Sequence, residues 1–310
     1  MNSPLKHRGV IVPMSTPFTP GGDVDDDAAE RIADRLAAHG LSVFVLGTTG
    51  ETSSIPTSQR ERVVNSALRA AAKRVPVYAG IGDNSLSDSI SAGNRYLKLG
   101  AAAVVAHMPS YYPIQPEEMR SYFERLHEAV HGPLMLYNIP QTTRMSLPLD
   151  VVEQLSSLPR VVGFKDSENT PGRLEEVARR FGGRPRFSIL MGTASQSLTA
   201  MRAGYDGVIP SSGNLVPELW ERFWNHASAG EWAQAEELQR KLDAIGQVLQ
   251  GSRGLGGYLA ALKAALAAQG ICDATVLPPL RPLSKQDREK VVAELKAIHV
   301  LGSCGAASPS

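Results

Sequence analysis

Cysteine is scarce in this chain, which has only Cys272 and Cys304 among its 310 residues. The two cysteines lie far apart without CxxC spacing, which fits a reducing compartment and excludes a cysteine-framed zinc site. An excess of charge of one sign is also missing, because 32 Lys and Arg nearly cancel 31 Asp and Glu. Since no large field favours nucleic acid or an anionic membrane surface, we expect a small-molecule partner and neither of these two.

Long apolar runs are absent as well. Those present are short, or are Ala-rich and interrupted by Lys263, whereas a membrane-spanning helix needs about 20 apolar residues. Residues 1–14 lack the apolar core of a secretory signal, and Pro13 interrupts their only short apolar run. These absences predict a cytoplasmic protein without a membrane segment.

Motifs for a metal or a nucleotide are missing too. The aspartates within residues 23–27 do not fit a calcium loop, because Ala28 stands where that loop requires glycine, and they indicate a helix cap instead. Four histidines show no metal-ligand spacing joined to carboxylates, so we expect no metal: His39, His107, His127 and His131.

The sequence does contain a repeated pairing of short apolar runs with segments of helical periodicity, which is typical of βα units around a parallel sheet. The pair repeats eight times and no GxGxxG comes after the first run, so we predict a (β/α)8 TIM barrel rather than a doubly wound sheet. The predicted strands are 10–14, 42–46, 76–79, 102–106, 134–137, 161–165, 187–191 and 207–209. The predicted helices include 25–39, 57–72, 85–99, 116–130 and 169–180.

The predicted domain organisation has three parts. Residues 1–216 form the catalytic barrel, and residues 217–300 form a C-terminal helical region packed on it. Residues 301–310 are a Ser/Ala/Gly tail that we expect to be disordered.

Unusual residues at the C-terminal ends of the predicted strands mark the expected site, because TIM barrels carry their chemistry there. Lys165 closes the apolar run 161–164, so its amine should point at the barrel mouth. Burial would lower the pKa of this lysine and supply a neutral amine able to attack a carbonyl. Taken alone, Lys165 fits equally well a lysine that merely ends a strand.

Two neighbouring segments favour the catalytic interpretation. Tyr137 ends the adjacent strand, about 4.8 Å away, where a phenol could pass a proton during imine formation and carbon–carbon cleavage; the alternative is a core tyrosine. The Gly47–Glu51 turn brings two hydroxyls and several backbone donors, which suit a substrate carboxylate. By itself this turn also fits a glycine turn with capping threonines. Tyr111 and Tyr112 fit a subunit contact, through which an oligomer could lend one of them to a neighbour's site.

Four segments together, GTTGE, the Tyr-Tyr pair, YNIP and GFKDS, resemble the dihydrodipicolinate synthase/N-acetylneuraminate lyase family of pyruvate-dependent class I aldolases, over nearly the whole chain. The resemblance implies a (β/α)8 barrel with a C-terminal helical region, commonly a homotetramer, and no metal or organic cofactor. It assigns the imine-forming lysine to Lys165, the general acid/base to Tyr137 and the hydroxylated turn to Thr48 and Thr49. It also assigns the tyrosine lent across a dimer interface to Tyr111, and a backbone carbonyl facing the site to Ile209.

Departures from the family motifs concern the substrate. Synthases carry a carboxylate-binding arginine where this chain has Thr142, and Arg144 lies two positions further. N-acetylneuraminate lyases carry an acidic pair where this chain has Thr193-Ala194-Ser195 after Gly192. We therefore place substrate contacts on Thr48, Thr49, Ile209, Thr142, Gly192 and Ser211. The candidate specificity positions are Thr142, Thr143, Thr193, Ser195, Ser211 and Asn214.

These features predict a Schiff-base lyase, an aldolase or dehydratase acting on pyruvate or a small 2-keto acid through Lys165, as a dimer or tetramer. One alternative is 4-hydroxy-tetrahydrodipicolinate synthase, which condenses pyruvate with aspartate semialdehyde. A second alternative is a non-catalytic regulatory protein that binds 2-keto acids.

Overall fold

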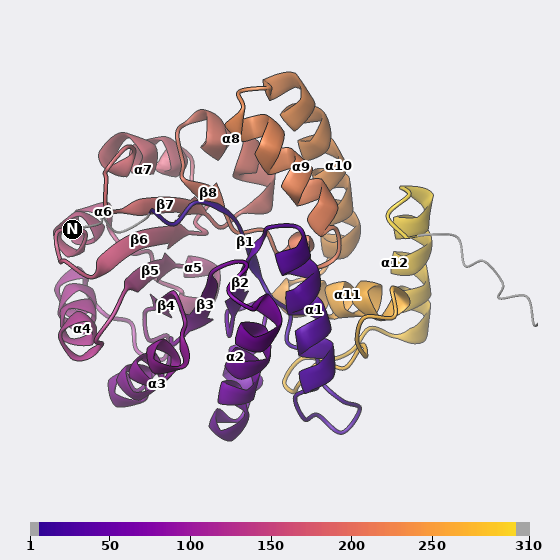
Figure 1. The fold of residues 1–310 in the computed structure, drawn as a ribbon, viewed down its shortest axis with the longest axis horizontal. Helices are drawn as coiled ribbons and strands as arrows, with labels where there is room; N and C mark the ends of the chain where they lie inside the picture. Colours follow the sequence, from indigo (N-terminus) through magenta and orange to yellow (C-terminus); the bar gives the residue numbers. More distant parts are fainter. Residues whose placement is uncertain (1–5, 302–310) are drawn as a thin grey trace, which may run out of the picture.

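A computed structural model describes residues 6–301 of the chain as a closed barrel of eight parallel strands paired in sequence order (Figure 1). The predicted TIM barrel is confirmed, and each predicted strand boundary lies within one residue of the observed one. The predicted tail lies outside the described residues except for Leu301. The strands are β1 (Gly9–Pro13), β2 (Ser42–Val45), β3 (Val77–Gly80), β4 (Ala103–His107), β5 (Leu134–Asn138), β6 (Val161–Asp166), β7 (Ser188–Met191) and β8 (Gly207–Val208).

Helices alternate with the strands and cover the outside of the barrel (Figure 1). Side-chain caps fix several of their starts; for example, Asp25 accepts from the Ala28 amide and Ser85 from the Asp88 amide. The helices are α1 (Asp26–Ala38), α2 (Thr57–Ala71), α3 (Leu86–Leu99), α4 (Pro116–Ala129), α5 (Pro140–Thr143), α6 (Leu149–Leu155), α7 (Arg173–Phe181), α8 (Ser197–Arg202), α9 (Pro217–Ser228), α10 (Trp232–Gln250), α11 (Leu255–Ala268) and α12 (Lys285–Ala297).

One helix start was predicted wrongly. The periodicity predicted a helix from residue 169, but α7 begins at Arg173. Gly172, with φ of 79°, has a left-handed backbone that cannot continue a helix. The residues between β6 and α7 therefore remain a loop at the barrel mouth.

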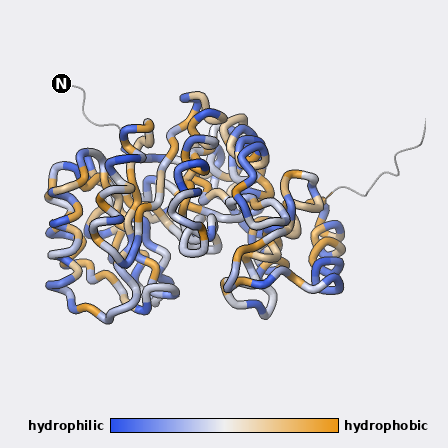
Figure 2. The backbone as a smooth tube through the Cα atoms, turned by 90° about the horizontal axis from the view of Figure 1, so that it is seen from below, coloured by the Kyte–Doolittle hydropathy of each residue, from blue (hydrophilic) through white to orange (hydrophobic). Residues whose placement is uncertain are grey.

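Two apolar cores hold the barrel together. The larger lies between the strands and the surrounding helices, whose residues alternate between hydrophobic and hydrophilic in Figure 2. The smaller fills the barrel interior with side chains such as Ile11, Phe44, Tyr78 and Met135, and Tyr137 belongs to it. Because residues in a strand alternate between these two cores, the register fixes which side chains reach the mouth from inside.

The C-terminal helices lie to one side of the barrel (Figure 1). Helix α10 packs against α8, α9, α11 and α12. Helix α9 contacts β1, as the eighth helix of a barrel would. The division of the chain at residue 216 into a barrel and a C-terminal region stays a prediction. Among the described residues, no helix is both long and apolar enough to cross a membrane.

Candidate active site

Lys165 lies where the strand register predicts, at the C-terminal end of β6 and opposite Tyr137 of β5. Its side chain is buried, with 4 % of the residue exposed. The ammonium nitrogen Nζ lies 3.8 Å from the centroid of the Tyr137 ring and 5.0 Å from that of Phe44. Burial lowers the pKa of Lys165, and the neighbouring Tyr137 opposes this shift only in part.

The carboxylate nearest in sequence, Asp166, does not neutralise Lys165. Successive strand residues face opposite sides, and Asp166 receives hydrogen bonds from Arg173 Nε at 2.8 Å and Asn138 Nδ2 at 2.8 Å. Burial raises the pKa of Asp166, while the Arg173 guanidinium opposes that rise. Within residues 6–301, no carboxylate forms an ion pair with Lys165, so its proton is held weakly.

The threonine turn lies beside this lysine. Its backbone closes through Gly50 N–H to the Gly47 carbonyl and Glu51 N–H to the Thr48 carbonyl, each at 3.1 Å. The hydroxyl oxygen of Thr48 lies 3.4 Å from that of Tyr137, within reach for proton exchange. In the described chain, neither the Thr48 amide nor the Thr49 amide donates a backbone hydrogen bond.

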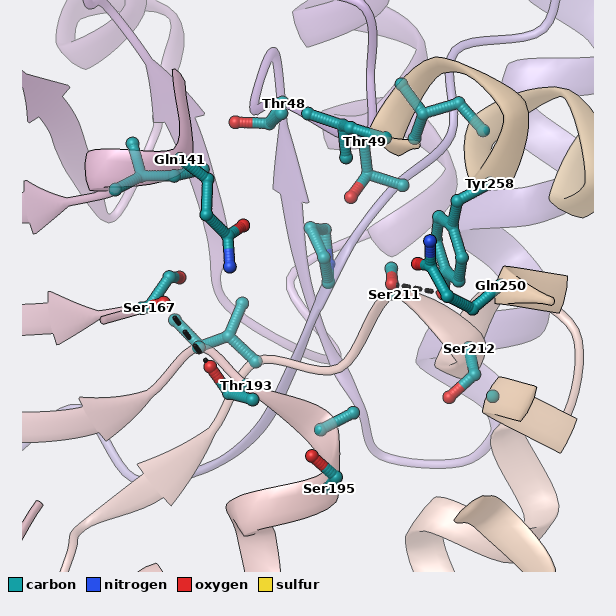
Figure 3. A pocket seen from close by; sticks show the side chains of 18 of the residues that line it. Thr48, Thr49, Gln141, Ser167, Thr193, Ser195, Ser211, Ser212, Gln250 and Tyr258 are labelled. Carbon is teal, nitrogen blue, oxygen red and sulfur yellow. Dashed lines mark hydrogen bonds between the residues drawn. The ribbon is translucent and has the colours of Figure 1, made fainter. Parts of the chain in front are cut away.

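Lys165, Tyr137, Thr48 and Thr49 line one cavity of about 500 Å³ at the barrel mouth. Figure 3 shows Thr48 and Thr49 side by side along one edge of this cavity. The cavity size suits a small molecule. Five further residues singled out in the sequence line it as well: Ile209, Gly192, Ser211, Thr193 and Ser195.

The remaining candidates lie elsewhere. Thr142 and Thr143 line a neighbouring cavity of about 450 Å³, which also borders Tyr137 and Thr48. Tyr111 lines neither cavity and is 76 % exposed. Asn214 is buried and holds the loop after β1 through bonds to the Ser15 amide and the Pro13 carbonyl.

Several lining residues were missed by the sequence reasoning. The Gln141 amide extends from α5 toward the middle of the cavity (Figure 3). Tyr258 of α11 shares a hydrogen bond of 2.6 Å with the Ser211 hydroxyl. Helix α10 contributes a polar wall, and Gln239 Nε2 donates to Asp243 Oδ1 there at 2.8 Å. The missed polar residues are Gln141, Ser212, Asp243, Gln247, Gln250 and Tyr258.

This arrangement favours amine chemistry at a carbonyl. A lysine whose pKa is lowered by burial, a phenol and a threonine turn line one cavity. In the part of the chain described here, no group of three or more His, Cys, Asp or Glu side chains could hold a metal ion. Residues of these types could supply a nucleophile, a proton carrier and an anion cradle.

Comparison with known proteins places these features in context. The Dihydrodipicolinate synthetase family matches residues 6–298. A 4-hydroxy-tetrahydrodipicolinate synthase of Phenylobacterium zucineum is 31% identical over 290 residues, which cover 93% of this chain and 96% of the relative. The probable 2-dehydro-3-deoxy-D-pentonate aldolase YjhH of Escherichia coli is 29% identical over 96% of this chain and 99% of its own.

Solved structures of dihydrodipicolinate synthases are also similar to this chain. The dihydrodipicolinate synthase of Bacteroides thetaiotaomicron superposes with a TM-score of 0.89 at 30% identity, covering 96% of this chain and 100% of the other. The Acinetobacter baumannii dihydrodipicolinate synthase, solved in complex with pyruvate, superposes with a TM-score of 0.88 at 28% identity, covering 95% of this chain and 99% of the other.

Proposed function

The chain belongs to the dihydrodipicolinate synthetase family and is a pyruvate-dependent Schiff-base lyase, and we propose that Lys165 forms its imine with pyruvate or a small 2-keto acid. The observation that carries this assignment is the buried Lys165 amine, which lies 3.8 Å from the Tyr137 ring centroid and has a lowered pKa. An amine that loses its proton easily is the nucleophile that imine formation requires.

The proposed chemistry begins when the neutral Lys165 amine adds to the C2 carbonyl carbon. Tyr137 delivers a proton to the hydroxyl of the resulting carbinolamine, which departs as water and leaves a protonated imine. In an aldol cleavage, Tyr137 takes the proton of the C4 hydroxyl, the imine accepts the electron pair of the C3–C4 bond, an aldehyde departs and an enamine remains. Protonation of the enamine at C3 and hydrolysis then release pyruvate and restore Lys165.

Tyr137 carries protons in these steps. Its hydroxyl borders the cavity and lies 3.4 Å from the Thr48 hydroxyl, which can pass a proton onward. The unpaired amides of Thr48 and Thr49 bind the carboxylate at C1 of the keto acid. The turn would thereby fix C2 beside the amine.

Reductive trapping tests the assignment of Lys165. With pyruvate and borohydride, the peptide containing Lys165 should gain the mass of a reduced pyruvyl group. Because burial lowers the pKa of Lys165, more of its amine is neutral at a given pH. The labelling rate should therefore level off below pH 10.5, the ordinary lysine value. Labelling at other lysines only would contradict the proposal.

The cavity charges favour cleavage of a 2-keto acid with an uncharged aldehyde portion over the synthase reaction. Among the described residues, Lys165 and Asp243 are the only Lys, Arg, Asp or Glu side chains that line the cavity. Once Lys165 is an imine, the lining offers no second cation to pair with another carboxylate, such as that of aspartate semialdehyde, and an unpaired buried charge is costly. The relatives' names include both reactions, so a screen of 2-keto acids for pyruvate release, run beside semialdehyde condensation, decides between them.

Arg144 is not expected to replace the synthase arginine. It is exposed at the end of α5 and lines neither cavity. Changing Arg144 to alanine should alter the rate of any semialdehyde condensation by less than about twofold, the usual range for a surface substitution. A loss well beyond this would show that Arg144 reaches the substrate.

We propose Tyr111 as a residue lent to a second copy of the chain. Tyr111 and Tyr112 are both exposed and stack edge to face, with 5.0 Å between ring centroids. The 450 Å³ cavity beside Thr48 and Tyr137 offers room for a tyrosine from a partner. A large exposed aromatic pair is typical of an interface. A homo-oligomer therefore stays our prediction. A cytoplasmic location stays a prediction from the sequence.

Mixing two inactive variants tests this sharing. In a random mixture of Tyr111→Ala and Lys165→Arg proteins, about one site in four would combine an intact Lys165 with a partner's intact Tyr111. Activity should reappear after subunit exchange, to about a quarter of wild type. If the mixture stays inactive although mass analysis shows mixed oligomers, Tyr111 does not act across the interface.

A further inference from the structure

A second buried lysine lies behind the threonine turn. Lys263, in the middle of α11, and Glu51, the last residue of the turn, both have fully buried side chains and form an ion pair of 2.9 Å between Nζ and Oε1. Lys263 also donates to the Thr275 carbonyl at 2.8 Å, and its Nζ lies 4.1 Å from the Phe18 ring centroid. No step of the proposed chemistry uses this pair.

The Glu51 carboxylate joins the turn to the C-terminal region. Its Oε1 meets Lys263, and its Oε2 accepts a hydrogen bond of 2.9 Å from the Leu277 amide. Residues 263 and 277 lie more than two hundred positions along the chain from residue 51. The carboxylate therefore ties the turn at two points.

The backbone of Glu51 has an unfavourable conformation that the two side-chain contacts stabilise. Its φ of 56° lies in the left-handed region, which costs free energy for a residue with a Cβ. In this conformation the Glu51 amide closes the turn on the Thr48 carbonyl at 3.1 Å. The side-chain ties hold Glu51 in a conformation that a free turn would leave.

Stability alone does not account for such a pair. Replacing a buried ion pair with apolar side chains of similar volume is often neutral or stabilising, since removing two charges from water is costly. Burial lowers the pKa of Lys263, and Glu51 acts in the opposite direction, so the lysine depends on its partner to stay charged. What the apolar replacement would lose is the hydrogen bond from the Leu277 amide to Oε2 and the close ion pair with Lys263, which together hold the turn.

We propose that the Lys263–Glu51 pair is a positioning device that keeps the Thr48 and Thr49 amides aimed at the keto-acid carboxylate. The binding of pyruvate then depends on helix α11, which carries none of the reacting groups. This inference rests on the proposed function only in identifying the ligand of the turn.

The test replaces both charges together, as Glu51→Met with Lys263→Met, so that neither is left buried alone. We expect the pyruvate concentration that half-saturates trapping of Lys165 to rise at least about tenfold, the scale of losing charge-assisted hydrogen bonds. We also expect faster amide hydrogen exchange in the peptide that contains the turn. The thermal midpoint should move by only a few degrees.

A control pair, less buried than Lys263 and Glu51, lies at the opposite end of the barrel. Asp206, just before β8, pairs with Lys6 Nζ at 2.8 Å and accepts a bond from the Ile189 amide at 3.1 Å, so it too joins a lysine and a backbone donor. The double variant Lys6→Met with Asp206→Met should keep the wild-type half-saturation and the wild-type exchange of the turn.

Three outcomes separate the possibilities. A folded Glu51→Met, Lys263→Met protein with wild-type half-saturation and wild-type exchange overturns the inference. If wild-type protein is not labelled by pyruvate, the proposed function fails, while exchange of the turn still decides whether the pair positions it. If the double methionine variant does not fold, Glu51→Gln with Lys263→Met keeps an acceptor for Leu277, and the same two measurements on that variant decide.

Discussion

Arginine in place of Lys165 should lower the rate of deuterium incorporation into the methyl group of pyruvate by on the order of 10⁴-fold or more. This exchange needs only imine and enamine formation, so it can be measured by NMR in deuterated water without knowing the second substrate. The guanidinium stays protonated at every accessible pH and cannot add to a carbonyl. Its similar size and apolar stem limit other disturbance of the pocket.

The matched control for Lys165 is Lys98, which is exposed in the last turn of α3, far in sequence from the site. Lys98→Arg keeps the favourable charge near the helix C-terminus and should leave exchange unchanged. If Lys165→Arg retains more than a small fraction of the wild-type exchange rate, another amine carries the imine and the assignment is wrong.

The Tyr137→Phe variant should lose about 10²-fold or more in the same exchange rate, the scale of general acid–base catalysis. The amine would remain, so borohydride should still label Lys165 with pyruvate, although more slowly. This combination of a retained label and lost turnover distinguishes a proton carrier from a residue that only shapes the pocket. The loss of labelling rate and the loss of exchange rate are both measured on the same protein sample and then compared.

Tyr78→Phe provides the control for Tyr137. Tyr78 also belongs to the core inside the barrel, but its hydroxyl pairs with the His7 ring at 2.9 Å and does not line the cavity. Removing that hydroxyl should affect stability more than exchange. Equal losses from Tyr78→Phe and Tyr137→Phe would mean that the loss reflects a disturbed barrel and not proton transfer.

Local sequence patterns were sufficient to predict the barrel and to place the residues at the centre of the candidate site together. A strand shows in the sequence as a short apolar run, and the chemistry of a TIM barrel lies where such runs end. Lys165 and Tyr137 could therefore be placed at one mouth, and the turn containing Thr48 could be added from its composition. The start of α7 was predicted too early because the helical periodicity of the sequence continues back to residue 169. The left-handed backbone of Gly172 prevents these residues from joining the helix.

Long-range packing determined what the sequence did not predict. Asp243 and Tyr258 reach the cavity because α10 and α11 pack over the mouth, and periodicity shows that a helix has a polar face without showing what that face meets. Lys263 was known only as a lysine in an Ala-rich helix, since its partner Glu51 is distant in sequence. Asn214 looked like a specificity residue, although its amide holds backbone beneath the site.

The wall formed by α10 gives the molecule two parts that can change separately. The groups assigned to bond breaking come from the barrel, whereas Asp243, Gln247 and Gln250 stand on a helix that contributes none of them. Random substitution at these three positions alone would alter the surface met by the far end of a substrate and leave the imine chemistry in place. Evolution, or a laboratory library, could thus exchange one aldehyde for another through a few substitutions in α10.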